Sequence, residues 1–306
     1  MSARPQHFVR GVICTLSGAT LWGFSGACFQ LLIERYHMPV LFMTSVRMLG
    51  AGFLFLLVIL FTQRSALLGV LKQGKALIQL AIYGVVGLFL SQFTYLMAIN
   101  YTNAGTATVL QCLGIVLIMI VTCTVAKRLP HIYETIGLVL AIVATFLLAT
   151  HGNPLVIAMP LLGLVWGLAT GVSYAFYSLY PKRLLQRHSA LIVTGVSTLI
   201  GGILITLVIR PWTIPVTLQL GSAAALIATI LFGSFGSFYL YVQGISDIGP
   251  MRASLLGAVE PVSATFFCWI WLGTHFPLID LAGFALMIAM IFFVTKQPKP
   301  TPQSEP

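Results

Sequence analysis

Long apolar stretches, following one another along almost the whole chain, restrict this sequence more than any other feature. Ten such stretches are separated by charged residues or by Pro and Gly breaks. Their approximate bounds are 8–33, 39–62, 76–98, 103–125, 131–150, 159–180, 189–209, 219–244, 251–272 and 277–295. A helix needs roughly 20 mostly apolar residues to cross a bilayer. We therefore predict an all-α, polytopic membrane protein with ten transmembrane helices.

The composition agrees with this fold class and excludes a water-soluble globule. Only 7% of the 306 residues are charged, whereas about a quarter is usual for soluble domains. The net charge of +10 does not indicate a nucleic-acid partner, because the basic residues are scattered between apolar stretches. All five cysteines lie inside apolar stretches and no CxxC spacing occurs. We therefore predict no metal site, no disulfide framework and no cofactor.

The distribution of basic residues predicts the orientation in the membrane. With a cytoplasmic N-terminus, thirteen Lys and Arg residues fall in inner segments, whereas only Arg35 and Arg210 fall in outer segments. This bias follows the positive-inside rule and predicts cytoplasmic N- and C-termini in the cell (inner) membrane. The first stretch is too long for a signal-peptide core, so we interpret it as an uncleaved first span.

The two halves of the chain resemble each other weakly. The pairs that carry this resemblance keep their order along the chain, with a spacing that drifts from 152 to 146: Gly11 with Gly163, Gly50 with Gly202, Gly84 with Gly233, Gly87 with Gly236, and Glu134 with Asp280. Each half would hold five spans, so the second half must enter the membrane in the opposite sense. Inverted repeats build a substrate site near the midplane that opens alternately to each side, which indicates transport.

We accordingly divide the chain into three parts. Residues 1–152 and 153–295 are predicted to form two five-helix repeats of inverted topology. Residues 296–306 are polar and rich in proline, which predicts a disordered cytoplasmic tail.

Four segments carry a resemblance to a known family. They are LWGFSG from Leu21, SVRMLGAGFLFLL from Ser45, AINYTNAGTATVL from Ala98 and RASLLGAVEPVSATFF from Arg252. Together with ten spans in two halves, they resemble the drug/metabolite transporter superfamily and, within it, the EamA family. The resemblance covers nearly the whole chain. It implies a central cavity lined by spans 1–4 and 6–9, with spans 5 and 10 at the periphery.

Two charged residues inside apolar stretches are the main candidates for chemistry, because charge at membrane depth is costly. Glu260 lies near the middle of the ninth stretch and could bind a proton or a substrate amine. Its structural alternative is a hydrogen-bonded carboxyl beside a kink at Pro261. Arg47 could bind a substrate carboxylate with two hydrogen bonds. Its structural alternatives are a fixed pair with Glu260 and a side chain that reaches the interface.

Polar and aromatic side chains recur at helical spacing in several stretches. Small ones such as Ser25 commonly mark close helix packing, whereas bulky ones work against it and favour a cavity lining. Together with Arg47 and Glu260, the predicted substrate-binding residues are Trp22, Ser25, Gln92, Tyr95, Gln111, Tyr177 and Tyr241.

These features favour a secondary, alternating-access transporter of small polar or amphipathic metabolites, with amino acids or related amines as the leading class. The alternative is an exporter of aromatic metabolites or drugs, and a lipid-handling or channel-like protein is a weaker one. No enzyme is predicted, because the six histidines lie in terminal or loop regions and Glu260 is the one carboxylate deep in a stretch. The expected partners are a small-molecule substrate, the lipid bilayer and a proton as candidate coupling ion. The sequence leaves a homodimer open.

Overall fold

The computed structural model describes residues 5–101, 104–150, 160–272 and 278–295, and the regular elements among these residues are all helices. The elements of the first half are α1 (Pro5–Glu34), α2 (Val40–Thr62), α3 (Arg64–Leu71), α4 (Gly74–Ile82), η1 (Tyr83–Phe89), α5 (Leu90–Tyr101), α6 (Ala104–Val125) and α7 (Ile132–Thr150). Those of the second half are α8 (Leu161–Leu179), α9 (Pro181–Leu185), α10 (Ala190–Ile209), η3 (Pro211–Thr213), α11 (Leu220–Ala228), η4 (Thr229–Gly236), α12 (Ser237–Ile248), α13 (Pro250–Gly257), α14 (Glu260–Leu272) and α15 (Leu278–Thr295).

Seven helical rods among the described residues are long and apolar enough to cross a membrane. They are Gln6–Glu34, Val40–Thr62, Gly74–Tyr101, Leu161–Leu185, Ala190–Thr213, Leu220–Ile248 and Pro250–Trp271. Two shorter apolar helices, Leu113–Val125 and Ile132–Ala144, lie within α6 and α7. The fold is therefore that of a polytopic helical membrane protein, while the count of ten spans stays a prediction.

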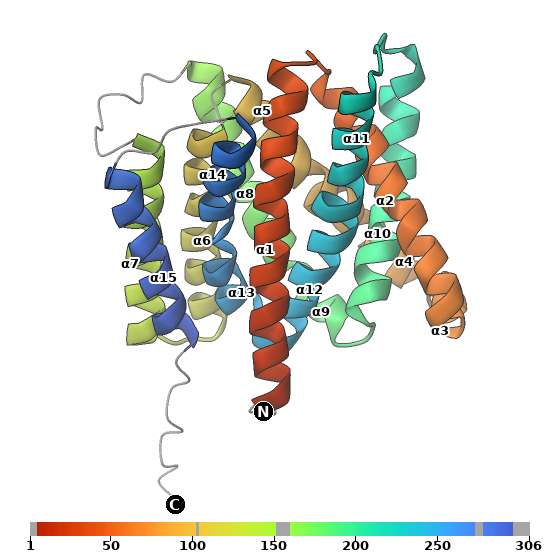
Figure 1. Cartoon of the computed structure of the whole chain (residues 1–306). Helices are drawn as coiled ribbons and strands as arrows, with labels where there is room; N and C mark the ends of the chain where they lie inside the picture. The colour runs from red at the N-terminus through yellow and green to blue at the C-terminus, as the bar shows by residue number, and fades with distance from the viewer. Residues whose placement is uncertain (1–4, 102–103, 151–159, 273–277, 296–306) are drawn as a thin grey trace, which may run out of the picture.

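The two halves interlock in one bundle. Helix α1, at the centre of the view in Figure 1, packs against α12 and α14 of the second half. In the same way, α8 packs against α5 and α6 of the first half, and α2 packs against α10. Helices α7 and α15 pair with each other at one edge (Figure 1). Helix α1 begins and α15 ends at the same end of the bundle (Figure 1).

Glycines allow unusually close contacts between helices at two places, between α1 and α14 and between η1 and α10. A Cβ atom on Gly23 of α1 would lie 2.5 Å from the backbone nitrogen of Ala264 and 2.7 Å from the carbonyl oxygen of Glu260, both in α14. A Cβ atom on Gly84 would meet the carbonyl oxygen of Ser197 in α10. Small residues permit such backbone contacts between membrane helices, where packing rather than the hydrophobic effect drives association.

Three helical rods are irregular in the middle. Two contain a π-helix, η1 between α4 and α5, and η4 between α11 and α12. These segments include Gly84 and Gly233, which the sequence comparison of the two halves paired. The third irregularity is a helix break just before Pro261, because α13 ends at Gly257 and α14 begins at Glu260. Such interruptions are frequent at functional sites in helical proteins.

Candidate functional site

A cavity lies between helices of both halves, beside the break that separates α13 from α14. Its volume is about 40 Å³, which is room for about three water molecules. The lining residues are Trp22, Ser25, Gly26, Phe29, Arg47, Ser91, Gln92, Tyr95, Gln111, Tyr174, Tyr177, Phe238 and Glu260. Eight of the nine predicted site residues are therefore brought together around one space.

The ninth predicted residue, Tyr241, lies behind the cavity wall instead of lining it. Its hydroxyl is 2.7 Å from the hydroxyl of Tyr174 and 3.1 Å from that of Ser178. Its ring stacks on Tyr177 with 5.5 Å between centroids. Tyr241 is thus placed to support the wall that Tyr174 and Tyr177 form.

Five lining residues are absent from the predicted set: Gly26, Phe29, Ser91, Tyr174 and Phe238. Two of them, Tyr174 and Phe238, lie in the second half of the chain. The helical pattern could have found both. Tyr174 follows Thr170 by four residues and precedes Tyr177 by three, and Phe238 precedes Tyr241 by three. Positions three and four apart lie on the same helix face, so helical spacing allows both positions, but the stripes used for the prediction did not include them.

Arg47 connects α2 to the π-helix η4 of the second half. Its Nη2 donates to the carbonyl oxygen of Gly233 at 2.8 Å, and its Nε donates to the hydroxyl of Ser234. The guanidinium lies over the ring of Phe29, 4.4 Å from the centroid. Arg47 is only 3% exposed, so it does not reach the membrane interface. Among the described residues no partner is recorded for its Nη1.

Glu260 occupies the first turn of α14, where the helix dipole favours a negative charge. Its Oε2 accepts a hydrogen bond from Nε2 of Gln111, on α6 of the first half, at 3.2 Å. The ion pairs found in the described part of the chain do not include Arg47 with Glu260. In this structure Arg47 and Glu260 therefore do not form the fixed pair that was one alternative for Arg47. Each of the two charged groups is instead held by the opposite half of the chain.

Aromatic rings close one side of the cavity. The ring of Trp22 lies 5.9 Å from that of Tyr177, 5.9 Å from Phe238 and 4.8 Å from Tyr241, measured between centroids. The indole Nε1 of Trp22 and the hydroxyl of Ser25 are buried without a hydrogen-bond partner among the described residues. Buried polar groups normally have partners, so both atoms have unused hydrogen-bonding capacity on residues that line the cavity.

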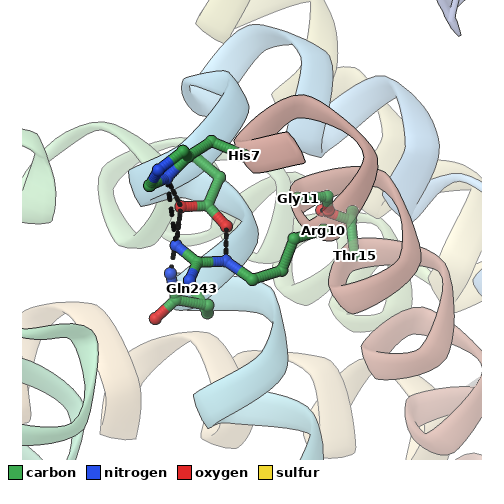
Figure 2. A network of polar contacts seen from close by, with 6 residues as sticks. His7, Arg10, Gly11, Thr15 and Gln243 are labelled. Carbon is green, nitrogen blue, oxygen red and sulfur yellow. Dashed lines mark hydrogen bonds and ion pairs between the residues drawn. The ribbon is translucent and has the colours of Figure 1, made fainter. Parts of the chain in front are cut away.

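A polar network joins α1 to α12 farther along α1, toward its first residue (Figure 2). Arg10 donates two hydrogen bonds to the carboxylate of Asp247, at 2.8 and 2.7 Å. Gln243 adds a third hydrogen bond to this carboxylate at 3.1 Å. Arg10 precedes Trp22 by twelve residues, which corresponds to about 18 Å of helix. The network therefore holds α1 and α12 together beyond the aromatic wall.

The cavity presents side chains that can bind a polar or aromatic ligand. Among the described residues, no group of three or more His, Cys, Asp or Glu side chains could hold a metal ion. The cavity instead offers a guanidinium, a carboxyl group, two amides and several aromatic rings.

Comparison with known proteins adds a family match over both halves. The model of the EamA-like transporter family matches residues 9–150 and again residues 161–296. An uncharacterized inner membrane transporter, YicL, of Salmonella typhimurium is 32% identical over 94% of this chain and 95% of its own length. The uncharacterized transporter YetK of Bacillus subtilis is 25% identical over 96% of this chain and 91% of its own length.

More distant proteins extend this similarity. An uncharacterized transporter of Archaeoglobus fulgidus is 24% identical over 83% of this chain and 87% of its own length. A protein of known crystal structure superposes with a TM-score of 0.71 at 17% identity, covering 91% of this chain and 96% of that chain. At this identity the superposition shows a shared fold and nothing more.

Proposed function

The chain belongs to the EamA-like transporter family, and from this premise we propose that it is an alternating-access secondary transporter of small zwitterions. Amino acids and related amines are the leading substrate class. We place the protein in the cell (inner) membrane with both termini in the cytoplasm, because the basic residues follow the positive-inside rule.

One observation carries the choice of substrate: Arg47 and Glu260 line the same cavity without forming an ion pair. Two opposite charges that are buried but not paired are costly, and a ligand that supplies both missing charges removes much of that cost. A carboxylate accepts hydrogen bonds from a guanidinium, and an ammonium group donates to a carboxylate. A zwitterion carries both groups and therefore complements both residues at once.

The packing of the helices supports alternating access. Helix α1, the first of the first predicted repeat, packs against α12 and α14 of the second. In the same way α8, the first of the second predicted repeat, packs against α5 and α6 of the first. The two π-helices occupy matching positions in the repeats, and each faces the second helix of the opposite repeat, because η1 packs on α10 and η4 packs on α2. This reciprocal arrangement is expected of inverted repeats that rock about a central site.

A ligand screen of the detergent-purified protein tests the substrate class. For each amino acid, the midpoint of thermal unfolding is measured with three ligands: the amino acid, its amide and its N-acetyl derivative. The amide lacks the carboxylate, and the N-acetyl derivative lacks the cationic amine. A ligand that binds the folded state raises the midpoint as its concentration exceeds its dissociation constant. We expect the zwitterion to stabilise the protein more than either derivative. Equal stabilisation by all three would contradict the proposal.

A second candidate is an exporter of aromatic metabolites, and the ring cluster of Trp22, Tyr177 and Phe238 favours it. Flat ligands gain from stacking on such rings. The same screen separates the two candidates. A flat neutral aromatic compound that stabilises the protein more than a small aliphatic amino acid does would favour the second.

A further inference from the structure

A second cavity lies at the end of the bundle where α6 ends and α9 begins. Its volume is about 590 Å³, within the range of cavities that hold small ligands. Its walls come from the last turns of α6 and α8, and two basic residues of α9, Lys182 and Arg183, also line it. We call this cavity the α6–α9 groove.

The two basic residues of the α6–α9 groove are free to bind an anion. Both side chains belong to exposed residues, and the ion pairs of the described chain include neither of them. A neighbouring groove on α6 is lined by Lys127 and Arg128, but there Arg128 is already bound to Glu134 at 2.8 and 3.0 Å. The positive-inside bias explains cations at this end of the bundle but not their placement on an open groove.

The remaining lining of the groove is mainly apolar, with polar atoms only at intervals. Val121 and Val125 of α6 are 43% and 77% exposed, and Phe176 and Leu179 of α8 line the same groove. The hydroxyl of Thr122, also in the lining, is buried with no hydrogen-bond partner in the described chain. An exposed apolar surface next to unpaired cations matches an amphiphile with an anionic head.

We propose that the α6–α9 groove is a binding site for one anionic phospholipid. The phosphate of the headgroup is bound by Lys182 and Arg183, and an acyl chain lies along Val121, Val125 and Leu179. Basic pockets between helices at the cytoplasmic face suit such headgroups. The groove combines α6 of the first half with α8, α9 and Pro250 of the second, so the bound lipid touches both halves of the chain. This site does not depend on the substrate proposed above.

Lipid-dependent stability of the full chain in detergent tests this site. Dioleoyl phosphatidylglycerol, dioleoyl phosphatidylcholine and inorganic phosphate are added separately, and the unfolding midpoint is followed against concentration. We expect phosphatidylglycerol alone to raise the midpoint. In the variant Lys182→Gln with Arg183→Gln, the concentration that gives half of this effect should rise about 30-fold, since each basic residue contributes about a factor of five.

Two further variants keep the test decisive. Arg64→Gln with Lys72→Gln removes two exposed charges outside the groove and should leave the response unchanged. Val121→Trp fills the apolar part without altering charge and should weaken the response to phosphatidylglycerol. Native mass spectrometry should count one bound phosphatidylglycerol that the Lys182 and Arg183 double variant loses. Equal effects of phosphatidylcholine, the full effect from phosphate alone, or equal losses in the two charge variants would overturn the proposal.

Discussion

Arg47 and Glu260 are each oriented by the half of the chain to which they do not belong. Gly233 and Ser234 hold the guanidinium, and Gln111 holds the carboxyl group. Fixing charged groups before a ligand arrives lowers the ordering cost of binding. Because these bonds cross between the halves, a relative movement of the halves would also change the geometry of both groups.

The first prediction concerns Arg47. We expect Arg47→Ala to weaken binding of carboxylate-bearing ligands by about tenfold or more, the usual effect of losing hydrogen bonds to a charged group. Neutral ligands of the same shape should lose much less. Arg47→Lys keeps the charge but not the paired donors, so its loss should be intermediate. Isothermal titration of the purified variants measures these affinities, and an equal loss for both ligand types would assign Arg47 to folding.

The second prediction concerns Glu260. Glutamine keeps the shape of this side chain and its acceptor oxygen toward Gln111 but cannot gain or lose a proton. We therefore expect Glu260→Gln to abolish the pH dependence of transport in proteoliposomes. The measurement is the initial rate of uptake, with the pH set to several values on both sides of the vesicle membrane. Unchanged pH dependence in the variant would give Glu260 a structural role.

Much of the site could be predicted at this scale because polar groups are scarce. A charged residue in a membrane stretch is rare enough to be informative by itself, so Arg47 and Glu260 were evident. Their hydrogen-bond partners were not, because Arg47 binds the backbone carbonyl of Gly233, and no side chain marks a carbonyl in a sequence. The supporting position of Tyr241 also depends on packing between helices, which spacing along one helix does not determine.

At the scale of helices, α1 packs very closely against two helices of the second half, α14 and α12. Gly23 lets it approach the backbone of α14 at the turn that carries Glu260, and Ser263 of α14 donates to the carbonyl of Thr20 at 3.0 Å. Farther along, Gly11 lies against Asp247 and Ile248 of α12. Helix α1 is therefore fixed to two helices of the other half by contacts that leave no room for larger side chains.

The third prediction follows from the crossing of α1 and α14. Gly23→Ala would place a methyl group against backbone atoms of α14 that cannot turn away, so we expect a loss of about 1–3 kcal/mol in the free energy of unfolding. Gly26→Ala is the matched control one turn later. There a Cβ atom would meet only the hydroxyl of Tyr95 at 3.5 Å, an ordinary contact. Comparable midpoints of thermal unfolding for the two variants would contradict this account of the crossing.

The fourth prediction concerns the network between α1 and α12. Thr15 is fully buried and lies where a Cβ atom on Gly244 of α12 would go, so a cysteine in its place reports separation of these helices. In a background without native cysteines, we expect Asp247→Asn to speed labelling of Thr15→Cys by an impermeant maleimide about fivefold. A fivefold change corresponds to roughly 1 kcal/mol in the free energy of separating the two helices, the upper range for the contribution of a partly exposed ion pair.

A matched control for this labelling experiment breaks another ion pair of the chain. Glu134→Gln removes the partner of Arg128, and neither residue touches the contact between α1 and α12. This variant should leave the labelling rate unchanged. If Asp247→Asn also left it unchanged, the Arg10–Asp247 network would not hold the two helices together.

The helix pattern was predicted better than its irregularities. All ten predicted apolar stretches contain helices in the described residues, because burial in lipid and in the protein interior both select apolar side chains. The short helices α3 and α9 in the connections were not predicted, since they are too brief to show a clear period. The π-helices were also missed, because one extra residue in a helical turn leaves no distinct mark in an apolar sequence.

For the whole molecule, the cavity is smaller than the substrates we propose. A cavity of about 40 Å³ leaves little room for an amino acid, so we expect the walls to move when a ligand enters. In the alternating-access mechanism that we propose, rocking one half of the bundle against the other would change the cavity at both ends. The weak similarity between the halves suggested this arrangement, but only the packing of α1 and α8 shows which helices exchange contacts.

The central claim is that one cavity carries a zwitterion alternately to each side of the membrane. Counterflow in proteoliposomes tests this claim most directly. Vesicles are preloaded with an unlabelled amino acid that stabilises the purified protein, and uptake of the same labelled amino acid is followed. We predict faster uptake than in empty vesicles, with a transient overshoot, and no overshoot in vesicles containing Arg47→Ala protein. Uptake at the same rate with and without preloading would indicate a channel and would contradict the account.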